Sequence, residues 1–296
     1  MNDLEQILNK LPEKIKIPIM ELPRQIRKEL EEIRIRAYGS IHILSGSQEI
    51  TVGLKNDAPI TGADLETILN NLLDYSYYAY EEELAKGYLT ISGGHRIGVC
   101  GRAVVDRGRI SLIKDISSLN LRRSREIIGA AEPVLPHVLS QDHKLLNTLI
   151  ISPPKCGKTT LLRDLVRLLS CRGFKVGVCD ERSEIAGIRM GKPSYDLGPR
   201  TDVMDGCPKA EGMTMLIRAM SPDVVVTDEI GRQADVEAIQ NAICSGVNIL
   251  TTIHGKSYED TKTSEIGDLI EKKIFRRLIF LTDQPHTGTI REVIHV

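Results

Sequence analysis

The second half of the chain alternates short apolar runs with segments of helical periodicity. The apolar runs are LNTLIIS, KVGVCD, DVVVTDE and VNILTTIH, and the helical segments among them are TTLLRDLVRLLS, AEGMTMLIRAM and DVEAIQNAI. Strands that alternate with helices predict a mostly parallel sheet with helices on both faces. The two closing runs, RRLIFLTD and TIREVIHV, predict an antiparallel pair at one edge of this sheet. We therefore expect an α/β domain over residues 124–296, entered through a helical connector at about 124–140 that is broken near Pro133 and Pro136.

The first half of the chain mixes helical periodicity with β-type runs. The predicted helices cover residues 2–11, 22–34, 63–73 and 76–84, and the predicted strands cover residues 40–44, 48–53 and three runs between 87 and 123. The helix at 22–34 depends on Ile26, Leu30 and Ile33, whose spacing places them on one helical face. Glycines between β-branched residues after Gly87 favour a small curved antiparallel sheet. Residues 1–123 are therefore predicted to form a smaller α+β domain.

Composition and charge restrict the class of protein. Hydrophobic residues make up 41% of the chain and charged residues 27%, which is the profile of a soluble globular protein. There are 39 Lys and Arg against 40 Asp and Glu, a net charge of −1, whereas a protein that grips a phosphate backbone usually carries a basic excess. The chain also has no Trp and only three Phe with which to stack on bases. Nucleic acid is therefore not expected as a partner.

The cysteines and the N-terminus bear on the cellular compartment. None of the six cysteines forms a C-x-x-C pair, so neither a zinc site nor a redox motif is expected, and scattered cysteines fit a reducing cytosol. The first residues lack the long apolar core of a signal peptide, and no apolar stretch approaches the ~20 residues needed to span a bilayer. We expect a cytoplasmic protein that is at most peripheral to a membrane.

One predicted strand–helix junction carries a phosphate-binding sequence. The run LNTLIIS leads into Ser152, Pro153, Pro154, Lys155, Cys156, Gly157, Lys158, Thr159 and Thr160. The ending Gly-Lys-Thr matches the P-loop pattern, in which backbone N–H groups at a helix N-terminus bind phosphates. Lys158 would reach the β- and γ-phosphates of ATP, and the Thr159 hydroxyl would coordinate Mg²⁺. Ser152 replaces the first glycine of the pattern and is less free than glycine at positive φ.

The run DVVVTDE ends in two carboxylates about seventy residues after the P-loop. A parallel strand delivers these side chains to its carboxyl end, where ligands bind in open α/β sheets. Asp228 is the expected magnesium ligand, directly or through water. Glu229 is then placed to orient and deprotonate the attacking water.

The run KVGVCD also leads into acids, namely Asp180, Glu181 and Glu184. Carboxylates beside a bound phosphate repel it unless a metal or arginines intervene. These acids could tune the attacking water or the metal ligands, or they could form ordinary salt bridges with Arg182 or Arg189. The spacing leaves both interpretations open.

The order of these motifs resembles that of the type II and type IV secretion and pilus-assembly ATPases. That family names the later motifs the Asp box, Walker B and the His box, which correspond here to CDERSE, LIRAMSPDVVVTDEIGR and SGVNILTTIHG. The resemblance implies a RecA-like P-loop NTPase core with Glu229 as the catalytic acid and Glu181 as an alternative base. It also implies that Arg218 belongs to the Walker B region. His254, which ends its strand at the same sheet edge, would sense the γ-phosphate, whereas from the residues alone a structural role is equally open.

Longer stretches resemble the stage III sporulation AA family of endospore-forming bacteria. Over about residues 85 to 255 the resembling segments are SGGHRIGVCGRAVV, KDISSLNLR, CGKTTLLRDLVR, CDERSEIAG, RTDVMDGCPKAEGMTMLIRAMSPDVVVTDEIGR and TTIHG. The resemblance implies the cytosolic ATPase of a channel between mother cell and forespore, with ATP and Mg²⁺ as cofactors. It implies a ring, expected to be a homo-hexamer, beneath a membrane complex of the other proteins of the same operon.

Related ATPases also carry arginines on the N-terminal domain that reach the nucleotide. The candidates in this sequence are Arg96, Arg102, Arg122 and Arg123. Solvated surface arginines are the alternative interpretation for some of them.

Three functions agree with these motifs. The first is a motor, in which ATP hydrolysis opens and closes two domains and a membrane partner uses the motion. The second is a nucleotide-dependent nucleic-acid remodeller, because the same core also serves helicases and recombinases. A salt-dependent affinity for DNA or RNA would support it. The third is a nucleotide-bound structural module that hydrolyses little, which a single-turnover ATPase assay would distinguish from the first.

Overall fold

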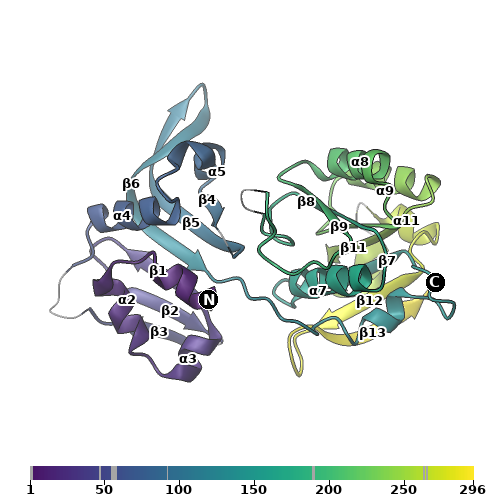
Figure 1. The fold of residues 1–296 in the computed structure, drawn as a ribbon, viewed down its shortest axis with the longest axis horizontal. Coiled ribbons are helices and arrows are strands. Elements are labelled where there is room, and N and C mark those ends of the chain that lie inside the picture. Colours follow the sequence, from purple (N-terminus) through teal and green to yellow (C-terminus); the bar gives the residue numbers. More distant parts are fainter. Residues whose placement is uncertain are drawn as a thin grey trace. The chain divides into compact units, whose positions relative to one another are not determined.

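The computed structural model describes residues 3–46, 48–54, 59–91, 93–188, 191–262, 264 and 266–296. The chain folds into two compact units, Met1–Arg125 and Glu126–Val296 (Figure 1). Each unit has its own sheet and its own hydrophobic core. No described helix combines the length and hydrophobicity that are needed to cross a bilayer.

The N-terminal unit is built on an antiparallel sheet whose described strands have the order β3-β2-β1-β6-β5-β4 (Figure 1). The strands are β1 (Leu30–Arg36), β2 (Ile41–Ser45), β3 (Gln48–Val52), β4 (Tyr88–Ile91), β5 (His95–Asp106) and β6 (Arg109–Arg122). β4 pairs with residues 95–98 of β5, and β1 pairs with residues 118–122 of β6. The far ends of β5 and β6 therefore extend beyond the rest of the sheet.

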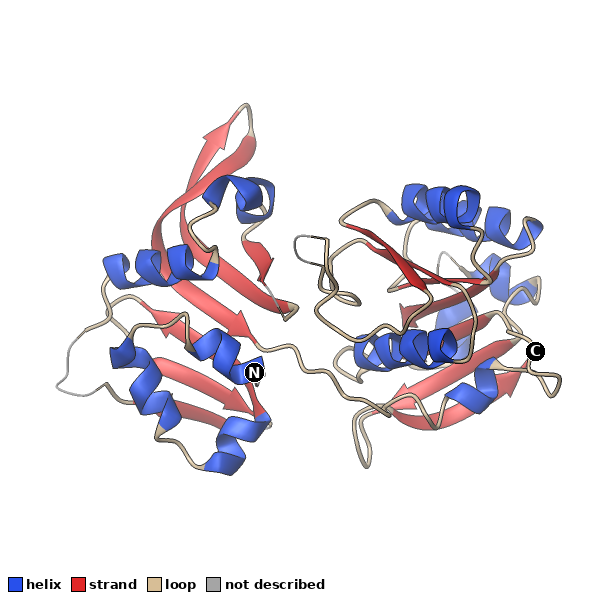
Figure 2. Ribbon diagram, in the orientation of Figure 1, coloured by secondary structure: helices blue, strands red, loops and turns tan. Residues whose placement is uncertain are grey.

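Helices cover one face of this sheet (Figure 2). They are α1 (Asp3–Leu8), α2 (Glu13–Met20), α3 (Arg24–Glu29), α4 (Gly62–Leu72), the 3₁₀ helix η2 (Tyr77–Tyr80) and α5 (Glu81–Ala85). The Thr61 hydroxyl accepts a hydrogen bond from the Asp64 amide at 3.3 Å, which begins α4 with a capping box as helices often begin. Because side chains alternate across a strand, residues such as Ile33, Ile97 and Leu121 join the core under the helices. The polar residues between them line the opposite, uncovered face.

The predicted helix at 22–34 is wrong in its second half. α3 ends at Glu29 and β1 begins at Leu30, which is fully buried. The residues from Ile33 to Arg36 also alternate apolar and charged with a period of two, and pairing with β2 and β6 on both sides stabilises the strand. The predicted hairpin at 40–53 and the helix at 63–73 are confirmed as β2, β3 and α4.

The C-terminal unit contains the predicted mostly parallel sheet, with the described strands in the order β13-β12-β7-β11-β10-β8-β9. Its strands are β7 (Thr148–Ser152), β8 (Val176–Asp180), β9 (Thr201–Asp205), β10 (Val224–Thr227), β11 (Asn248–His254), β12 (Arg277–Thr282) and β13 (Thr289–His295). The final pair, β12 and β13, is antiparallel and lies at one edge, which confirms the prediction for the last two runs. β9 was not predicted because its sequence, TDVMD, is mostly polar and it lies at the opposite edge.

Helices cover both faces of this second sheet (Figure 2). They are α6 (Leu135–Val138), α7 (Lys158–Cys171), α8 (Lys209–Met220), α9 (Gln233–Cys244), α10 (Tyr258–Lys262) and α11 (Gly267–Glu271). Neighbouring residues of β7 serve the two layers, since Ile150 packs with α7 while Leu149 and Ile151 pack with α8 and α9. Between residues 124 and 140 the chain is α-helical only over α6, so the predicted connector is helical in its last part alone. Pro133 precedes this helix, and Pro136 stands in its first turn, where a missing backbone N–H costs no hydrogen bond.

Candidate nucleotide site

The loop between β7 and α7 has the backbone of an anion-binding turn. Lys155 and Gly157 have positive φ values of 65° and 78°, and Gly157 is the N-cap residue of α7. A β-carbon at Gly157 would lie 3.0 Å from Cγ2 of Thr287, so both its φ and its neighbour favour glycine. Ser152 does not have a positive φ and ends β7 as a strand residue, which is why serine can replace the first glycine of the pattern without strain. The turn and the N-terminus of α7 thus form a backbone that is suited to bind phosphate.

Lys158 is the first residue of α7, and its ammonium group is held within the loop. Nζ donates to the carbonyl oxygen of Ser152 at 3.2 Å and to that of Pro153 at 3.3 Å. It also lies 2.7 Å from Nδ1 of His254, at the end of β11. Burial lowers the pKa of Lys158, although the charge of Glu229 acts in the opposite direction. A partly buried cation with neutral acceptors is suited to a negatively charged ligand.

His254 joins the P-loop lysine to the acid of the Walker B strand. Its Nε2 lies 3.0 Å from Oε2 of Glu229, while its Nδ1 faces Lys158. Because an ammonium group can only donate, Nδ1 accepts, and Nε2 then carries the proton that it donates to Glu229. Parallel pairing of β11 with both β7 and β10 brings the three residues to one edge. The sequence predicted all three residues at one sheet edge but did not predict their contacts.

Lys209 neutralises the remaining acids of this edge. Its Nζ lies 2.9 Å from Oδ1 of Asp228 and 3.4 Å from Oε2 of Glu181, and it donates to the backbone carbonyl of Glu229. Burial opposes the charge on Lys209, but Asp228 and Glu181 outweigh it and raise the pKa of the lysine. Burial also raises the pKa of Asp228, and Lys209 limits that rise. Arg232 adds a second contact to Glu181, at 3.5 Å.

Asp180, the first acid of the Asp box, has a structural role. Its two carboxylate oxygens accept hydrogen bonds from the backbone amides of Glu184, Ile185 and Ala186 at 2.8–2.9 Å. The residue is fully buried, and burial raises its pKa to about 6 even though these hydrogen bonds act against the rise. Asp180 thus shapes the loop after β8, and Glu181 is the acid of this segment that reaches Lys209 and Asp228.

The remaining predicted site residues lie at different distances from this cluster. Thr159 and Thr160 are partly exposed on the first turn of α7, beside Lys158. Arg218 is exposed on the last turn of α8, about 14 Å along the helix from Lys209, and the structure does not bring it together with the other site residues of the chain. Arg189 lies outside the described residues.

Lys209 was missed by the sequence interpretation. It directly precedes the segment predicted as a helix, AEGMTMLIRAM, and a lysine at a helix start normally indicates only a solvated side chain. The available signal was its position just after Pro208, which fixes the entry into α8 where the chain leaves the acidic end of β9.

The described donors suit a magnesium ion bound together with phosphate. No group of three or more His, Cys, Asp or Glu in the described ranges is arranged to hold a metal ion by itself. Thr159 and Asp228 supply hard oxygen donors at the same edge. Mg²⁺ prefers such donors and usually completes its shell with water and substrate phosphate oxygens. The two residues therefore fit the ion that ATP would bring.

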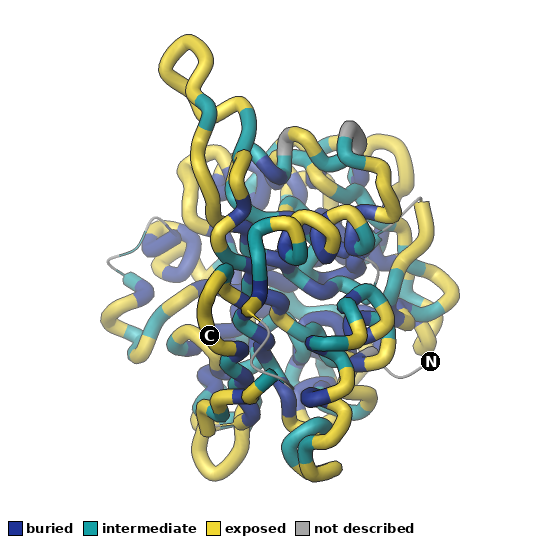
Figure 3. The backbone as a smooth tube through the Cα atoms, turned by 90° about the vertical axis from the view of Figure 1, so that its left-hand side faces the viewer, coloured by how far each residue is buried: buried dark blue, intermediate teal, exposed yellow. Residues whose placement is uncertain are grey.

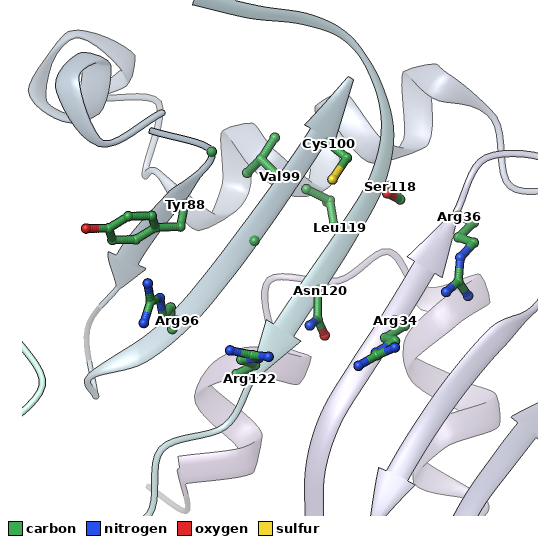
Figure 4. Close-up of a pocket in the computed structure, with 12 residues that line it drawn as sticks. Arg34, Arg36, Tyr88, Arg96, Val99, Cys100, Ser118, Leu119, Asn120 and Arg122 are labelled. Carbon is green, nitrogen blue, oxygen red and sulfur yellow. The ribbon is translucent and has the colours of Figure 1, made fainter. Parts of the chain in front are cut away.

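A second group of cations lies in the N-terminal unit, in a pocket of about 400 Å³ on the uncovered face of its sheet (Figure 4). Arg34 and Arg36 come from β1, Arg96 from β5 and Arg122 from β6. The guanidinium group of Arg96 lies 4.2 Å from the ring centroid of Tyr88 on β4, which fixes its plane. The pocket thus carries an excess of arginine on a rigid surface.

The four N-terminal arginines that were predicted from the sequence lie in different surroundings. Arg96 and Arg122 both line this pocket, which we name the arginine pocket. Arg102 lies outside it, is highly exposed and faces Asp115 at 4.0 Å. Arg123 donates to the backbone carbonyls of Arg27 and Lys28, so it secures the end of α3.

Solved structures with a similar fold are secretion and pilus ATPases. The structure of the pilus retraction motor PilT with bound ADP superposes with a TM-score of 0.59 and 15% identity, covering 95% of this chain and 80% of that one. The Legionella pneumophila ATPase DotB gives a TM-score of 0.55 with 16% identity, covering 85% of this chain and 72% of that one. These likenesses confirm the fold class, a RecA-like P-loop core with a mostly parallel sheet and a smaller N-terminal unit.

Sequence relatives are more specific. The family described as sporulation stage III, protein AA, matches residues 1–295. Stage III sporulation protein AA of Bacillus subtilis (strain 168) is 42% identical over 299 residues, covering 99% of this chain and 94% of that protein. A more distant relative, the uncharacterized protein ycf45 of Porphyra purpurea, is 28% identical over 158 residues, 52% of this chain and 27% of that protein. The chain therefore belongs to the stage III sporulation protein AA family.

Proposed function

We propose that this protein is a Mg²⁺-dependent ATPase that converts ATP and water to ADP and phosphate. The observation that carries the proposal is the continuous contact from Lys158 through His254 to Glu229, directly beside the phosphate loop. A lysine, a relay and a carboxylate at one sheet edge are the parts that phosphoryl transfer to water requires.

Each side chain has a distinct role in this proposal. The amides at the start of α7 and the ammonium of Lys158 bind the β- and γ-phosphates, which requires Lys158 to release its carbonyl acceptors and His254. His254 then loses one of its two contacts, so it is placed to report phosphate binding to Glu229. Glu229 accepts a proton from the attacking water. Glu181 remains the alternative base.

Thr159 and Asp228 would hold Mg²⁺, which neutralises charge that develops on the phosphate oxygens when it is bound. Lys209 keeps Asp228 oriented through the 2.9 Å contact, so the carboxylate is fixed before the ion arrives. Because a carboxylate that is already held by an ion pair needs little reorganisation, this arrangement favours binding.

The biological role of ATP hydrolysis is inferred from the family and from the fold. We propose a homo-hexameric motor on the cytoplasmic side of a membrane channel complex in the mother cell, with the other proteins of the same sporulation operon as partners. The sporulation family assignment and the likeness of the fold to a pilus retraction motor support this.

Glu229→Gln tests the enzymatic part. Glutamine keeps the shape and the contact to His254 but accepts no proton, so turnover should fall by ~10²–10⁴-fold while ATP still binds. Glu237→Gln, an exposed acid on α9, is the matched control and should hydrolyse at the wild-type rate. Steady-state phosphate release and binding of a fluorescent ATP analogue measure the two quantities. Near-normal turnover of Glu229→Gln would indicate that Glu181 is the base. If the wild-type chain shows no turnover, the protein would instead be a nucleotide-bound structural module.

A further inference from the structure

The far ends of β5 and β6 form a two-stranded ribbon that projects from the N-terminal unit, and we name residues 101–116 the hairpin arm. Within the arm, Arg102 pairs with Lys114 and Asp106 pairs with Arg109, and no other described strand pairs with this stretch. Figure 3 shows the arm as a mostly exposed loop that extends beyond the body of the unit. The contacts described above for the nucleotide site involve residues of the other unit and none of the arm.

The geometry of the arm is specified by the sequence. Arg107 and Gly108 form the two-residue turn with positive φ values of 47° and 78°, as tight β-hairpins require. At its base, the register shifts at Gly101, where a β-carbon would lie only 2.5 Å from the carbonyl oxygen of Lys114. Asp115 opposite has a positive φ of 47°. A bulge of this kind bends a ribbon away from its sheet, so the projection is built in.

One face of the arm is apolar and uncovered. Val105 pairs with Ile110, and Ala103 pairs with Ile113, two residues along β5 and therefore on the same face. Ile113 packs against the core of the unit, whereas Val105 and Ile110 are 62% and 48% exposed. The apolar face of the arm thus begins at the core of the unit and continues along the arm into solvent.

The same segment is cationic. The arm contains Arg102, Arg107, Arg109 and Lys114 against Asp106 and Asp115. Four cations less two acids give a net charge of +2, in a chain whose total is −1. Arg102 faces Asp115, while in the described ranges no carboxylate lies within 4.0 Å of a charged nitrogen of Arg107, Arg109 or Lys114. These side chains are therefore available to an anionic surface.

We propose that the hairpin arm docks on the surface of an anionic lipid bilayer. Aliphatic side chains bordered by Arg and Lys are the combination that binds such an interface, because the apolar groups enter the headgroup region while the long cationic chains reach the lipid phosphates. Nucleic acid fits less well, since the arm has no aromatic side chain to stack on bases and its exposed Val105 and Ile110 would gain nothing from a phosphate backbone. A contact with a second copy of this chain is the other alternative, and the test below distinguishes it.

Both halves of the arm's surface should contribute measurably to the affinity. Each cation near an anionic bilayer adds about fivefold to the partition coefficient, and this part is lost in high salt. Immersion of Val105 and Ile110 should add about tenfold or more together, a part that salt does not weaken.

Co-sedimentation of the full chain with lipid vesicles tests the proposal. Vesicles of phosphatidylcholine with one third phosphatidylglycerol should bind the protein at low salt, and pure phosphatidylcholine vesicles should not. Val105→Ser with Ile110→Ser should lower the partition coefficient about tenfold. Arg107→Gln with Arg109→Gln should lower it by about 25-fold. ATP hydrolysis should be unchanged in both variants, so failure here is distinct from failure of the proposed activity.

Matched controls remove the same chemistry elsewhere on the unit. Ile17→Ser with Met20→Ser deletes two apolar residues that are 40% and 39% exposed on α2. Arg24→Gln with Lys28→Gln deletes two exposed cations of α3. Both controls should bind anionic vesicles as the wild type does.

Fluorescence gives a direct reading because the chain contains no tryptophan. Val105→Trp should shift its emission to the blue and be quenched by brominated lipid when anionic vesicles are added. Tyr38→Trp, at a residue that is 79% exposed, should do neither.

Three results would overturn the proposal. One is equal vesicle binding by the arm variants and the wild type. The second is a gel shift with DNA or RNA that the arm cations control while vesicles are not bound, which would make the ligand a nucleic acid. The third is loss of self-association in the arm variants, measured as mass in solution, with no vesicle binding by the wild type, which would make the arm a contact between copies of this chain.

Discussion

The nucleotide site and the arginine pocket both collect cations, but they compensate the charge differently. In the nucleotide site, Lys209 contacts two carboxylates and Lys158 is held by loop carbonyls and His254. Of the four arginines that line the pocket, two contact one acid, Glu32, which lies 2.8 Å from Arg34 and 3.2 Å from Arg122. Burial of Glu32 acts to raise its pKa, but these arginines outweigh burial and lower it. The nucleotide site is nearly balanced without a ligand, whereas the pocket keeps an excess of positive charge.

A ligand of the nucleotide site must displace the present partners of Lys158, whereas the excess positive charge of the arginine pocket attracts an anion. Lys158 has to leave its acceptors before it can bind phosphate, so binding is coupled to a rearrangement at His254. The pocket holds more arginines than acids, and a surface lined by one sign of charge raises the local concentration of its counter-ion. The two regions should therefore respond differently when single charges are removed.

The largest effect is expected for Lys158→Ala. Alanine removes the ammonium that faces the β- and γ-phosphates, and the phosphate charge is then left uncompensated in a partly buried site. ATP binding and hydrolysis should both fall below detection, measured by calorimetry and by phosphate release. Lys155→Ala, an exposed lysine of the same loop, should bind ATP within about threefold of the wild type, since an exposed charge contributes little. Hydrolysis at the wild-type rate by Lys158→Ala would remove the P-loop assignment.

The next effect concerns the arginine pocket. If its arginines act on ATP, as the resemblance to secretion ATPases implies, Arg96→Gln with Arg122→Gln should reduce turnover by up to ~10³-fold, the lower range for arginines in phosphoryl transfer. Arg102→Gln, outside the pocket, is the control and should be unaffected. Turnover per folded molecule is the quantity to measure. Equal rates for the double variant and the control would show that the pocket serves another anion.

A smaller effect is expected for Lys209→Met. Methionine keeps the length of the stem but leaves Asp228 and Glu181 without their shared cation, so the metal ligand is less well oriented. Loss of such a supporting contact typically costs ~10–100-fold in activity or metal affinity. Turnover as a function of Mg²⁺ concentration measures it, and Lys209→Arg should recover part of the loss. A Mg²⁺ profile identical to that of the wild type would show that Lys209 serves folding alone.

Much of the C-terminal unit could be predicted because its strands are buried on both faces. Fully apolar runs such as VVVT in β10 are unambiguous, and parallel order places their carboxyl ends, hence Lys158, Asp228 and His254, on one edge. The sequence did not predict which side chains contact one another, since neither the His254–Glu229 pair nor the position of Lys209 follows from spacing along separate strands.

The N-terminal unit was harder to predict because most of its helices are short and its strands are half exposed. At 30–36 the same apolar residues fit a helical face and a strand, and long-range pairing with β2 and β6 decided for the strand. The arginine pocket is assembled from β5, β6 and β1, and β1 is distant in sequence from the other two. Alternation predicts that each arginine faces away from the core but not that the four share one surface.

The smallest expected effect is a pH dependence of stability at Asp180. Its pKa in the folded protein is about 6, against 3.8 as the ordinary value, because burial disfavours its charge. The folded state therefore holds this proton more tightly than the unfolded state between these pH values, and the contribution of Asp180 to stability falls as pH rises from about 4 to 6. Below pH 4 both states are protonated, and above pH 6 the full penalty is present.

Asp180→Asn isolates this contribution, because its amide does not titrate and all other groups cancel in the difference. The variant should be less stable overall, since an amide cannot accept all three backbone hydrogen bonds from residues 184–186. The difference in the free energy of unfolding between wild type and variant should be smaller at pH 7 than at pH 5, by about 1 kcal/mol. Urea denaturation at the two pH values measures it. A difference that grew toward pH 7 would mean that the three amides stabilise the carboxylate more than burial opposes it, and the loop after β8 would then be held by an ionised Asp180 throughout this range.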